Sequence, residues 1–166
     1  KRFTGWFETC APCWPSRWWT YSTSDRMDTG ADVIEKLVIL RAWGGNLLAN
    51  IGPCADGSLP KEALEAWEEI EKWMKHSGES VYDVTGGSFP EKANQPTTIK
   101  KDIVYIHAFP NFHKTIVLKE IQSSPKQAIL LRTGETIPFS YAEGEIHIQV
   151  SPEKRSRMVD TIKLTW

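Results

Sequence analysis

Four residues near the N-terminus, Cys10-Ala11-Pro12-Cys13, form a Cys-x-x-Cys pair, a pattern found in redox dithiols and in zinc sites. A redox pair of this kind should follow a strand and open a helix, but Trp14-Pro15-Ser16 comes next and predicts a loop. A zinc site needs four ligands, and the chain offers only Cys54 and four scattered histidines besides this pair. We therefore expect neither a metal site nor a redox function here.

A second candidate site follows the apolar run 46–51, which Gly45 precedes and Gly52-Pro53 follows. Such a run is typical of a strand buried on both faces in a parallel sheet. Because ligands bind at the C-terminal ends of parallel strands, we expect Asn50 and the loop 52–58 to lie on the functional face. In the alternative interpretation, Asn50 pairs with neighbouring backbone and the glycines only shape the turn.

Tryptophan is concentrated in the N-terminal half, where a sugar-binding surface would need exposed rings. The chain has eight, and the seven in the first 75 residues are Trp6, Trp14, Trp18, Trp19, Trp43, Trp67 and Trp73. Some must fill a core, because large rings pack efficiently. Trp19 stands in a Pro-, Ser- and Thr-rich stretch, where its ring either stacks on a sugar or packs back onto the body as a loop anchor.

Helices on either side of the run 46–51 must position these residues. Residues 31–43 have apolar side chains at helical spacing and stop at Gly44-Gly45. Residues 60–77 place Leu64, Trp67, Ile70 and Met74 at steps of three and four. Helix, strand and helix make one repeat of an α/β fold, and one repeat cannot cover both faces of its strand. We therefore expect the end of a larger α/β domain whose earlier units are absent.

The pattern changes near residue 85 to short stretches with a period of two, separated by turn signals. A linker runs to Pro96, and the expected strands span 102–108, 115–121, 128–131, 136–139, 145–150 and 159–164. Short strands at close spacing without intervening helices predict a small antiparallel β-sandwich. The expected fold class is thus α/β plus all-β, with the α/β segment at residues 1–84 and the β-sandwich at 85–166.

Composition excludes several classes of protein. The 166 residues carry a formal net charge of −1, whereas a nucleic-acid-binding protein usually has a basic surplus. No apolar run reaches the roughly 18 residues that would span a bilayer. The chain begins with Lys1 and shows no signal-peptide pattern, so we expect a processed product or a piece of a longer protein. We expect no nucleic-acid or membrane partner.

One long string in the sequence resembles a known enzyme family. The string Gly44-Gly45-Asn46-Leu47-Leu48-x-Asn50-Ile51-Gly52-Pro53-x-x-Asp56-Gly57, with the later Gly78-Glu79-Ser80-Val81-Tyr82, resembles the end of the catalytic domain in the α-L-fucosidases of glycoside hydrolase family 29. Phe7-Glu8-Thr9-Cys10 resembles the family's Trp-Glu-Thr-Cys, and residues 97–107 resemble the opening of its C-terminal β-sandwich. The resemblance covers nearly the whole chain.

The resemblance implies the C-terminal part of a (β/α) barrel, followed by the β-sandwich, in an enzyme that releases terminal fucose from glycans with retention. It implies two catalytic carboxylates and no cofactor or metal. By position, Glu8 would be the general acid/base, a role in which a carboxylic acid protonates the leaving oxygen and later takes a proton from water. Neighbouring aromatic side chains would desolvate Glu8. Trp19 and Asn50 would contact the substrate.

The sequence also departs from the family pattern. The strand that carries the family's nucleophilic aspartate is absent, so we expect the missing N-terminal part of the catalytic domain to be a partner. Phe7 replaces the usual tryptophan. The family would place the parent protein outside the cell, in the periplasm or in the lysosome. The alternative function is a non-catalytic carbohydrate-binding module, which the exposed tryptophans, the β-sandwich and the missing nucleophile all permit.

Overall fold

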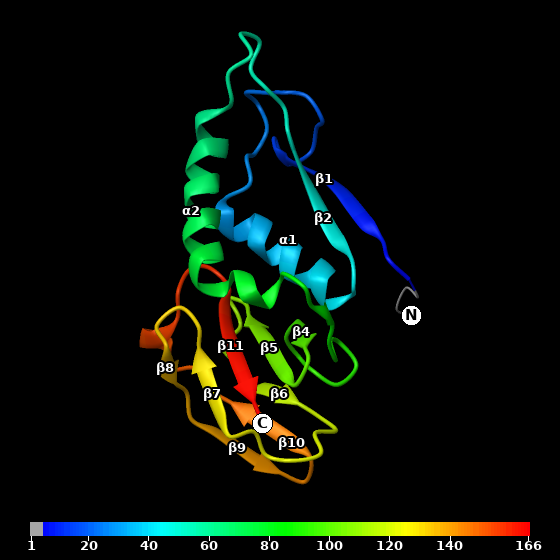
Figure 1. The fold of residues 1–166 in the computed structure, drawn as a ribbon. Helices are drawn as coiled ribbons and strands as arrows, with labels where there is room; N and C mark the ends of the chain where they lie inside the picture. Colours follow the sequence, from blue (N-terminus) through cyan, green and yellow to red (C-terminus); the bar gives the residue numbers. More distant parts are fainter. Residues whose placement is uncertain (1–4) are drawn as a thin grey trace.

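The structure, a computed structural model, describes residues 5–166, so the first four residues of the expected α/β segment lie outside it. Figure 1 shows a β/α layer at one end of the molecule and a β-sandwich at the other. Both parts of the expected fold class are confirmed, and the sequence order of the two is as expected.

The N-terminal layer alternates strands and helices. Its elements are β1 (Glu8–Trp14), α1 (Gly30–Ala42), β2 (Asn46–Ile51) and α2 (Lys61–Ser77), after which a short 3-10 helix, η1 (Gly78–Ser80), leads out. β1 and β2 pair in parallel, with Glu8 opposite Asn46. Because side chains alternate along a strand, β2 directs Leu47, Ala49 and Ile51 towards the apolar cluster formed with the two helices. Its other face carries Asn46, Leu48 and Asn50.

Local sequence sets the bounds of α1. The Thr29 hydroxyl accepts a hydrogen bond from the Asp32 backbone N–H at 3.2 Å, and the Asp32 carboxylate accepts one from the Thr29 N–H at 2.8 Å. This capping box satisfies two of the free N–H groups of the first turn. The helix ends at Ala42, and Gly44 follows with a φ of 86°, a left-handed conformation that favours glycine.

The buried side of α2 is not the side that the spacing predicts. Ala63, Ala66 and Trp73 are buried, whereas Leu64 and Trp67 are each about half exposed, at 50% and 49%. Leu48 in β2 is also 51% exposed, so β2 is covered on one face only. The expectation of a strand buried on both faces is therefore wrong for the described residues, because α1 and α2 pack on the same face of the two-stranded sheet.

β1 was not anticipated from the sequence. It contains the Cys-x-x-Cys pair, and of the loop expected at Trp14-Pro15-Ser16 only Trp14 belongs to the strand. Pro12 lies inside the strand, and the register shifts between Pro12 and Trp14. A proline has no N–H to donate and is tolerated where a strand is paired on one side, as β1 is by β2. This local irregularity hid the strand from the sequence pattern.

The remaining strands form a six-stranded sheet (β3-β4-β5-β11-β7-β8) and a three-stranded sheet (β6-β10-β9), both antiparallel throughout. Their bounds are β3 Thr85–Gly86, β4 Thr97–Lys100, β5 Ile103–Ala108, β6 Ile116–Leu118, β7 Gln127–Leu130, β8 Glu135–Thr136, β9 Phe139–Ala142, β10 Glu145–Ile148 and β11 Asp160–Thr165, with a 3-10 helix, η2, at Pro152–Lys154. Their inward side chains, including Ile106, Leu130 and Ile162, form one core.

Three expected strands differ by two residues or more, and the one at 145–150 ends early at Ile148. The strand at 115–121 shortens to three residues, and Glu120 adopts a left-handed φ of 58° just beyond it. The strand at 136–139 divides at Pro138, so that Thr136 ends β8 and Phe139 begins β9. Proline again explains the difference, since it cannot donate to a central ladder.

The two parts of the molecule are joined by direct contacts. Trp73 in α2 donates its indole N–H to the Val159 carbonyl at 2.8 Å, and both residues belong to one apolar cluster with Ile34 and Val38 of α1. Arg41 holds the connecting segment by donating to the carbonyls of Val81 at 3.1 Å and Val84 at 2.8 Å. The boundary between residues 84 and 85 stays a prediction, and β3 begins immediately after it.

Candidate functional site

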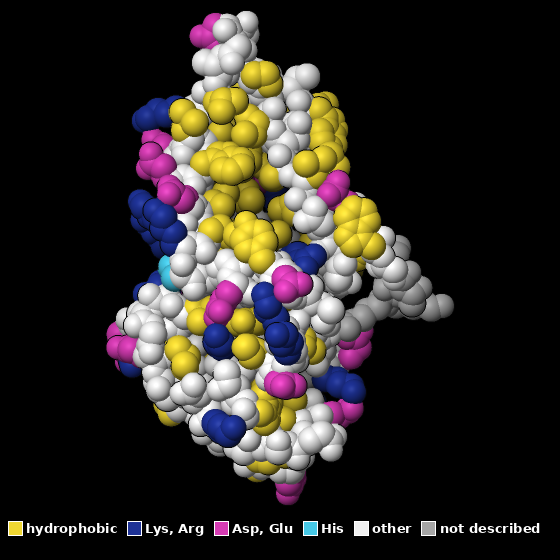
Figure 2. Space-filling view, viewed as in Figure 1, with side chains coloured by type: hydrophobic (Ala, Val, Ile, Leu, Met, Phe, Trp, Pro, Cys, Tyr) yellow, Lys and Arg dark blue, Asp and Glu magenta, His cyan; other side chains and the backbone are white. Residues whose placement is uncertain are grey.

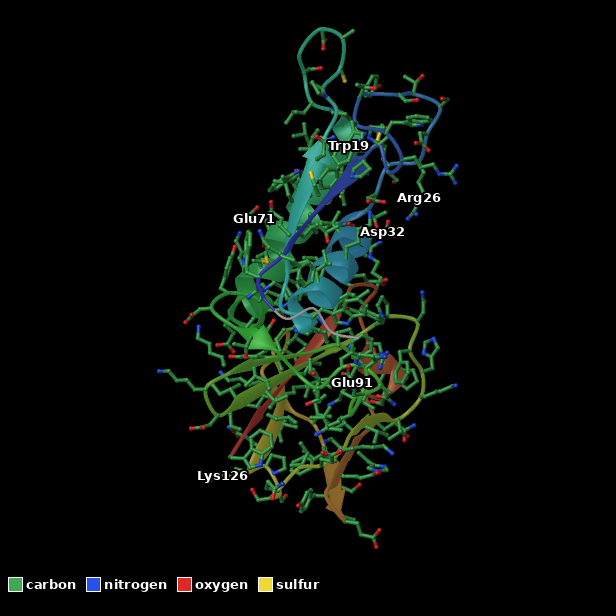
Figure 3. The ribbon with its side chains drawn as sticks, turned by 90° about the vertical axis from the view of Figure 1, so that its right-hand side faces the viewer. Trp19, Arg26, Asp32, Glu71, Glu91 and Lys126 are labelled. Atoms are coloured by element: carbon green, nitrogen blue, oxygen red, sulfur yellow. The ribbon has the colours of Figure 1, made fainter. Side chains whose placement is uncertain are left out.

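Two loops meet at the C-terminal ends of β1 and β2, at the end of the molecule remote from the β-sandwich (Figure 1). The first, called the aromatic loop below, spans residues 15–29, and the second spans residues 52–60. The Asn50 side-chain amide donates to the Trp19 carbonyl at 3.2 Å. Gly52 lies so close to the first loop that a Cβ there would stand 2.5 Å from the Tyr21 nitrogen. The structure thus brings Asn50 and Trp19 together, and Asn50 holds the loop by its backbone. Figure 3 shows Trp19 at this end.

The first loop presents aromatic rings to solvent. Trp18 is 61% exposed and Trp19 54% exposed, while Tyr21 is less open. Rings that keep an open face on a loop fixed by hydrogen bonds are suited to stack on an apolar ligand face. Cys54 of the second loop lies beside Tyr21 and raises the pKa of its hydroxyl. The two loops therefore form one surface.

Glu8 lies at the other end of the sheet. Its carboxylate accepts a 2.7 Å hydrogen bond from the Asn46 side-chain amide, at the start of both strands. Asn50 lies four positions beyond Asn46, which at about 3.3 Å per residue places the two about 13 Å apart along the strand. The structure therefore groups Trp19 with Asn50 and leaves Glu8 apart from both.

The surroundings of Glu8 also differ from the expectation of a desolvating aromatic shell. Glu8 is exposed, Trp6 is 76% exposed, and Trp14 is buried against Val33 and Ala63 on the helical side. Among the described residues, the aromatic side chains near it in sequence do not enclose its carboxylate.

The cysteines occupy different environments. Cys10 is exposed, Cys13 is buried, and the two are free thiols, as is Cys54. Burial raises the pKa of Cys13 to about 11, with the nearby Lys36 ammonium opposing the shift. Between residues 5 and 166, no three His, Cys, Asp or Glu side chains are grouped so that they could hold a metal ion. A thiol with a raised pKa is poorly suited to redox exchange.

Sequence reasoning missed several neighbours of the predicted site residues. Asn46 was noted only as a member of the apolar run and of the family string, and its contact with Glu8 depends on the unexpected strand β1. The buried Asp28 carboxylate pairs with Lys36 and accepts a 2.8 Å hydrogen bond from Ser16, between the first loop and α1. No local pattern marks these pairs, because each joins residues on different elements.

An apolar groove of about 630 Å³ opens between β2 and the helices. Trp67, Ile70 and Met74 of α2 form one wall, and Leu47 and Ala49 of β2 form another. Figure 2 shows hydrophobic side chains gathered over this half of the molecule. Trp67, Ile70 and Met74 belong to the side of α2 that the spacing predicted to be apolar. No element of the described residues fully covers that side.

Comparisons with known proteins agree with this architecture. A family model described as alpha-L-fucosidase matches residues 2–79. Tissue alpha-L-fucosidase of Rattus norvegicus is 37% identical over 140 residues, which cover 81% of this chain and 29% of that protein. Plasma alpha-L-fucosidase of Homo sapiens is 29% identical over 98 residues, covering 48% of this chain and 21% of that protein.

Solved structures extend the similarity over both parts of the fold. A GH29 alpha-L-fucosidase from Bacteroides thetaiotaomicron superposes with a TM-score of 0.80 at 28% identity, over 96% of this chain and 38% of that one. Alpha-L-fucosidase isoenzyme 1 from Paenibacillus thiaminolyticus shares the fold with a TM-score of 0.82 over 96% of this chain and 39% of that one. This chain spans less than two fifths of the length of either structure.

This fold and these matches indicate the class of glycoside hydrolases in which a β/α layer precedes a β-sandwich. Within that class, this chain is similar to the C-terminal portion of the α-L-fucosidases of glycoside hydrolase family 29. The resemblance drawn from the sequence motifs is confirmed.

Proposed function

We propose that this chain is part of an α-L-fucosidase that removes terminal α-L-fucose from glycans with retention of configuration. The 140-residue similarity to a tissue fucosidase carries the proposal. The Bacteroides relative is described as trapped as a covalent intermediate in complex with 2-fluoro-fucosyl fluoride, by means of a glutamate-to-glutamine mutant. A covalent glycosyl-enzyme intermediate is the mark of a retaining glycosidase.

Trp19 and Asn50 are assigned to the substrate-binding side of this reaction. They lie at the C-terminal ends of parallel strands, which is where β/α barrels bind their ligands. Asn50 fixes the loop backbone at Trp19, and the half-open indole is free to contact a sugar or the group that follows it. Aryl and glycan substrates would therefore respond differently to a change at Trp19.

Glu8 is assigned the acid/base role on its sequence motif alone, because its place at the start of β1 is remote from Trp19 and Asn50. The test is a Glu8→Gln variant in the longer protein that this proposal assumes. An acid/base carboxylate contributes about 10²–10⁴-fold, and the loss should be larger for a poor leaving group than for an activated aryl α-L-fucoside. Glu68→Gln, an exposed change on α2, is the matched control.

Unchanged turnover of Glu8→Gln on both substrates would remove Glu8 from the mechanism. The proposal for the family activity would then still stand, because a different carboxylate near the ends of the strands would have to supply the proton. The nucleophile is assigned to no residue of this chain.

The apolar groove and the uncovered face of β2 are assigned to the missing N-terminal part of the barrel. Leu48, Leu64 and Trp67 are each about half exposed. Within residues 5–166, β1 and β2 pair only with each other, so each has an outer edge free for a further strand. A neighbouring β/α unit would pair with such an edge and bury these side chains. The location of the parent protein outside the cell, in the periplasm or in the lysosome stays a prediction.

Binding by a non-catalytic carbohydrate-binding module is the competing function, and the open rings of Trp18 and Trp19 are the feature that favours it. Calorimetric titration of the chain with fucose separates the two. A half-built pocket should bind fucose negligibly, whereas a module should bind it measurably. Fucose binding that disappears in Trp19→Ala would favour the module.

A further inference from the structure

A second cavity, of about 420 Å³, lies in the β-sandwich at the end away from the aromatic loop. Its polar and aromatic lining comprises Lys101, Asp102, Glu120, Gln122, Ser123 and Trp166. Lys126 donates its backbone N–H to the Thr165 carbonyl and so marks this end of the molecule. Figure 3 shows Lys126 and Trp19 at opposite ends. The cavity is therefore separate from the site described above.

Trp166 gives the cavity a fixed aromatic wall. Its indole N–H donates to the Ser123 carbonyl at 2.8 Å, and part of the ring packs against the sandwich core. The ring is partly exposed and lines the cavity. An aromatic ring that is held in place before a ligand arrives loses little conformational freedom on binding.

Three polar side chains of the lining have no partner in the described part of the chain. The Asp102 carboxylate, the Gln122 amide and the Lys101 ammonium are exposed and form neither a hydrogen bond nor an ion pair there. Glu120 differs, because it pairs with Lys92. The three free groups supply both donors and acceptors beside the Trp166 ring.

This combination selects a class of ligand. A metal ion would need a group of His, Cys, Asp or Glu ligands, and none is found among residues 5–166. A carboxylate and an ammonium in one cavity favour neither an anion nor a cation. A neutral ring with several hydroxyls can use an aromatic wall together with separate donors and acceptors, and the cavity volume falls within the range of about 300–1,000 Å³ typical of small-ligand sites.

We propose that this cavity binds a neutral saccharide unit, as an accessory glycan site on the β-sandwich. The proposal rests on side chains of the sandwich and does not require the fucosidase activity proposed above. Another groove on the β-sandwich, called the second groove below, has a volume of about 600 Å³. Its lining includes His147 and Gln149 but no tryptophan. Trp166 is the feature that distinguishes the proposed site from this groove.

The test is a titration of the full chain with methyl α-L-fucoside, methyl β-D-galactoside and methyl α-D-mannoside. The NMR signal of the Trp166 indole N–H monitors binding. That signal is assigned by its loss in Trp166→Phe. At least one glycoside should shift it. Asp102→Ala and Gln122→Ala remove exposed groups and should preserve the fold, and each should weaken binding about tenfold, as expected for one lost hydrogen bond to a ligand. Gln149→Ala is the matched control in the second groove and should bind as the parent does.

Three outcomes would overturn the proposal. The first is a Trp166 signal that none of the three glycosides moves. The second is unchanged binding in both Asp102→Ala and Gln122→Ala. The third is loss of binding in Gln149→Ala, which would place the ligand in the second groove. None of these outcomes bears on the fucosidase proposal, because hydrolysis is not measured and Glu8, Trp19 and Asn50 are untouched.

Discussion

The Asn46 amide donates a 2.7 Å hydrogen bond to the Glu8 carboxylate across the parallel pair of strands. Asn46→Ala should lower the free energy of unfolding by about 0.5–1.5 kcal/mol, the usual contribution of such a bond. Glu8→Gln retains an oxygen acceptor and should cost less. Urea unfolding measures both, with the exposed Asn111→Ala as control. Equal stability of Asn46→Ala and Asn111→Ala would show that the bond does not hold the strands together.

Gly52 should be required for the position of the aromatic loop. A Cβ there would lie 2.5 Å from the Tyr21 nitrogen and 2.7 Å from the Thr20 carbonyl carbon, both backbone atoms. Gly52→Ala should therefore cost about 1–3 kcal/mol through overpacking. Gly57→Ala is the comparison, because Gly57 has a φ of 85° but open space around its Cα, so the change strains only the backbone. NMR shifts of the Trp19 indole should move in Gly52→Ala and stay in place in Gly57→Ala.

His107 should make the fold sensitive to acid. Burial lowers the pKa of His107 from 6.5 to about 3, and its ring contacts the Thr98 hydroxyl at 3.0 Å. The folded state keeps the ring neutral, whereas the unfolded chain protonates it below about pH 6.5. His107 therefore does not reduce the free energy of unfolding above about pH 6.5. As the pH falls from there towards 3, protonation of this residue in the unfolded chain lowers the free energy of unfolding by up to about 1.4 kcal/mol per pH unit.

Urea unfolding at a series of pH values measures this dependence. His107→Asn should flatten the decline between pH 6.5 and 3, even if it lowers stability throughout, because no titrating group remains at that position. His113→Asn, at an exposed histidine, should retain the slope of the parent. An identical slope in His107→Asn and the parent would contradict the assignment.

The two N-terminal thiols should differ in reactivity. Cys10 is exposed, while Cys13 is buried with a pKa raised to about 11, so iodoacetamide should modify Cys10 and spare Cys13 in the folded chain. Mass spectrometry of native and urea-unfolded samples identifies the labelled residue, with Cys10→Ser as the control. Rapid labelling of Cys13 in the native state would favour the redox interpretation that the structure otherwise disfavours.

Elements with a strong local signal were predictable from the sequence. α1 and α2 lie within one residue of their expected bounds, because caps and spacing are local properties. β1 was not predictable, because Pro12 obscures it and its pairing with β2 joins residues 38 apart in the sequence. For the same reason, the sequence motif could name Glu8 and Asn50 but could not reveal that they lie at opposite ends of the strands.

The junction between α2 and the β-sandwich has a consequence for ligands with several sugars. The bond from Trp73 to Val159 joins the two parts directly, and Arg41 fixes the segment that leads from α2 to the β-sandwich by its bonds to Val81 and Val84. The spacing between the Trp19 loop and the Trp166 cavity is then set by the fold. A branched glycan would gain avidity only if its arms match that spacing, and shorter oligosaccharides would occupy one end at a time.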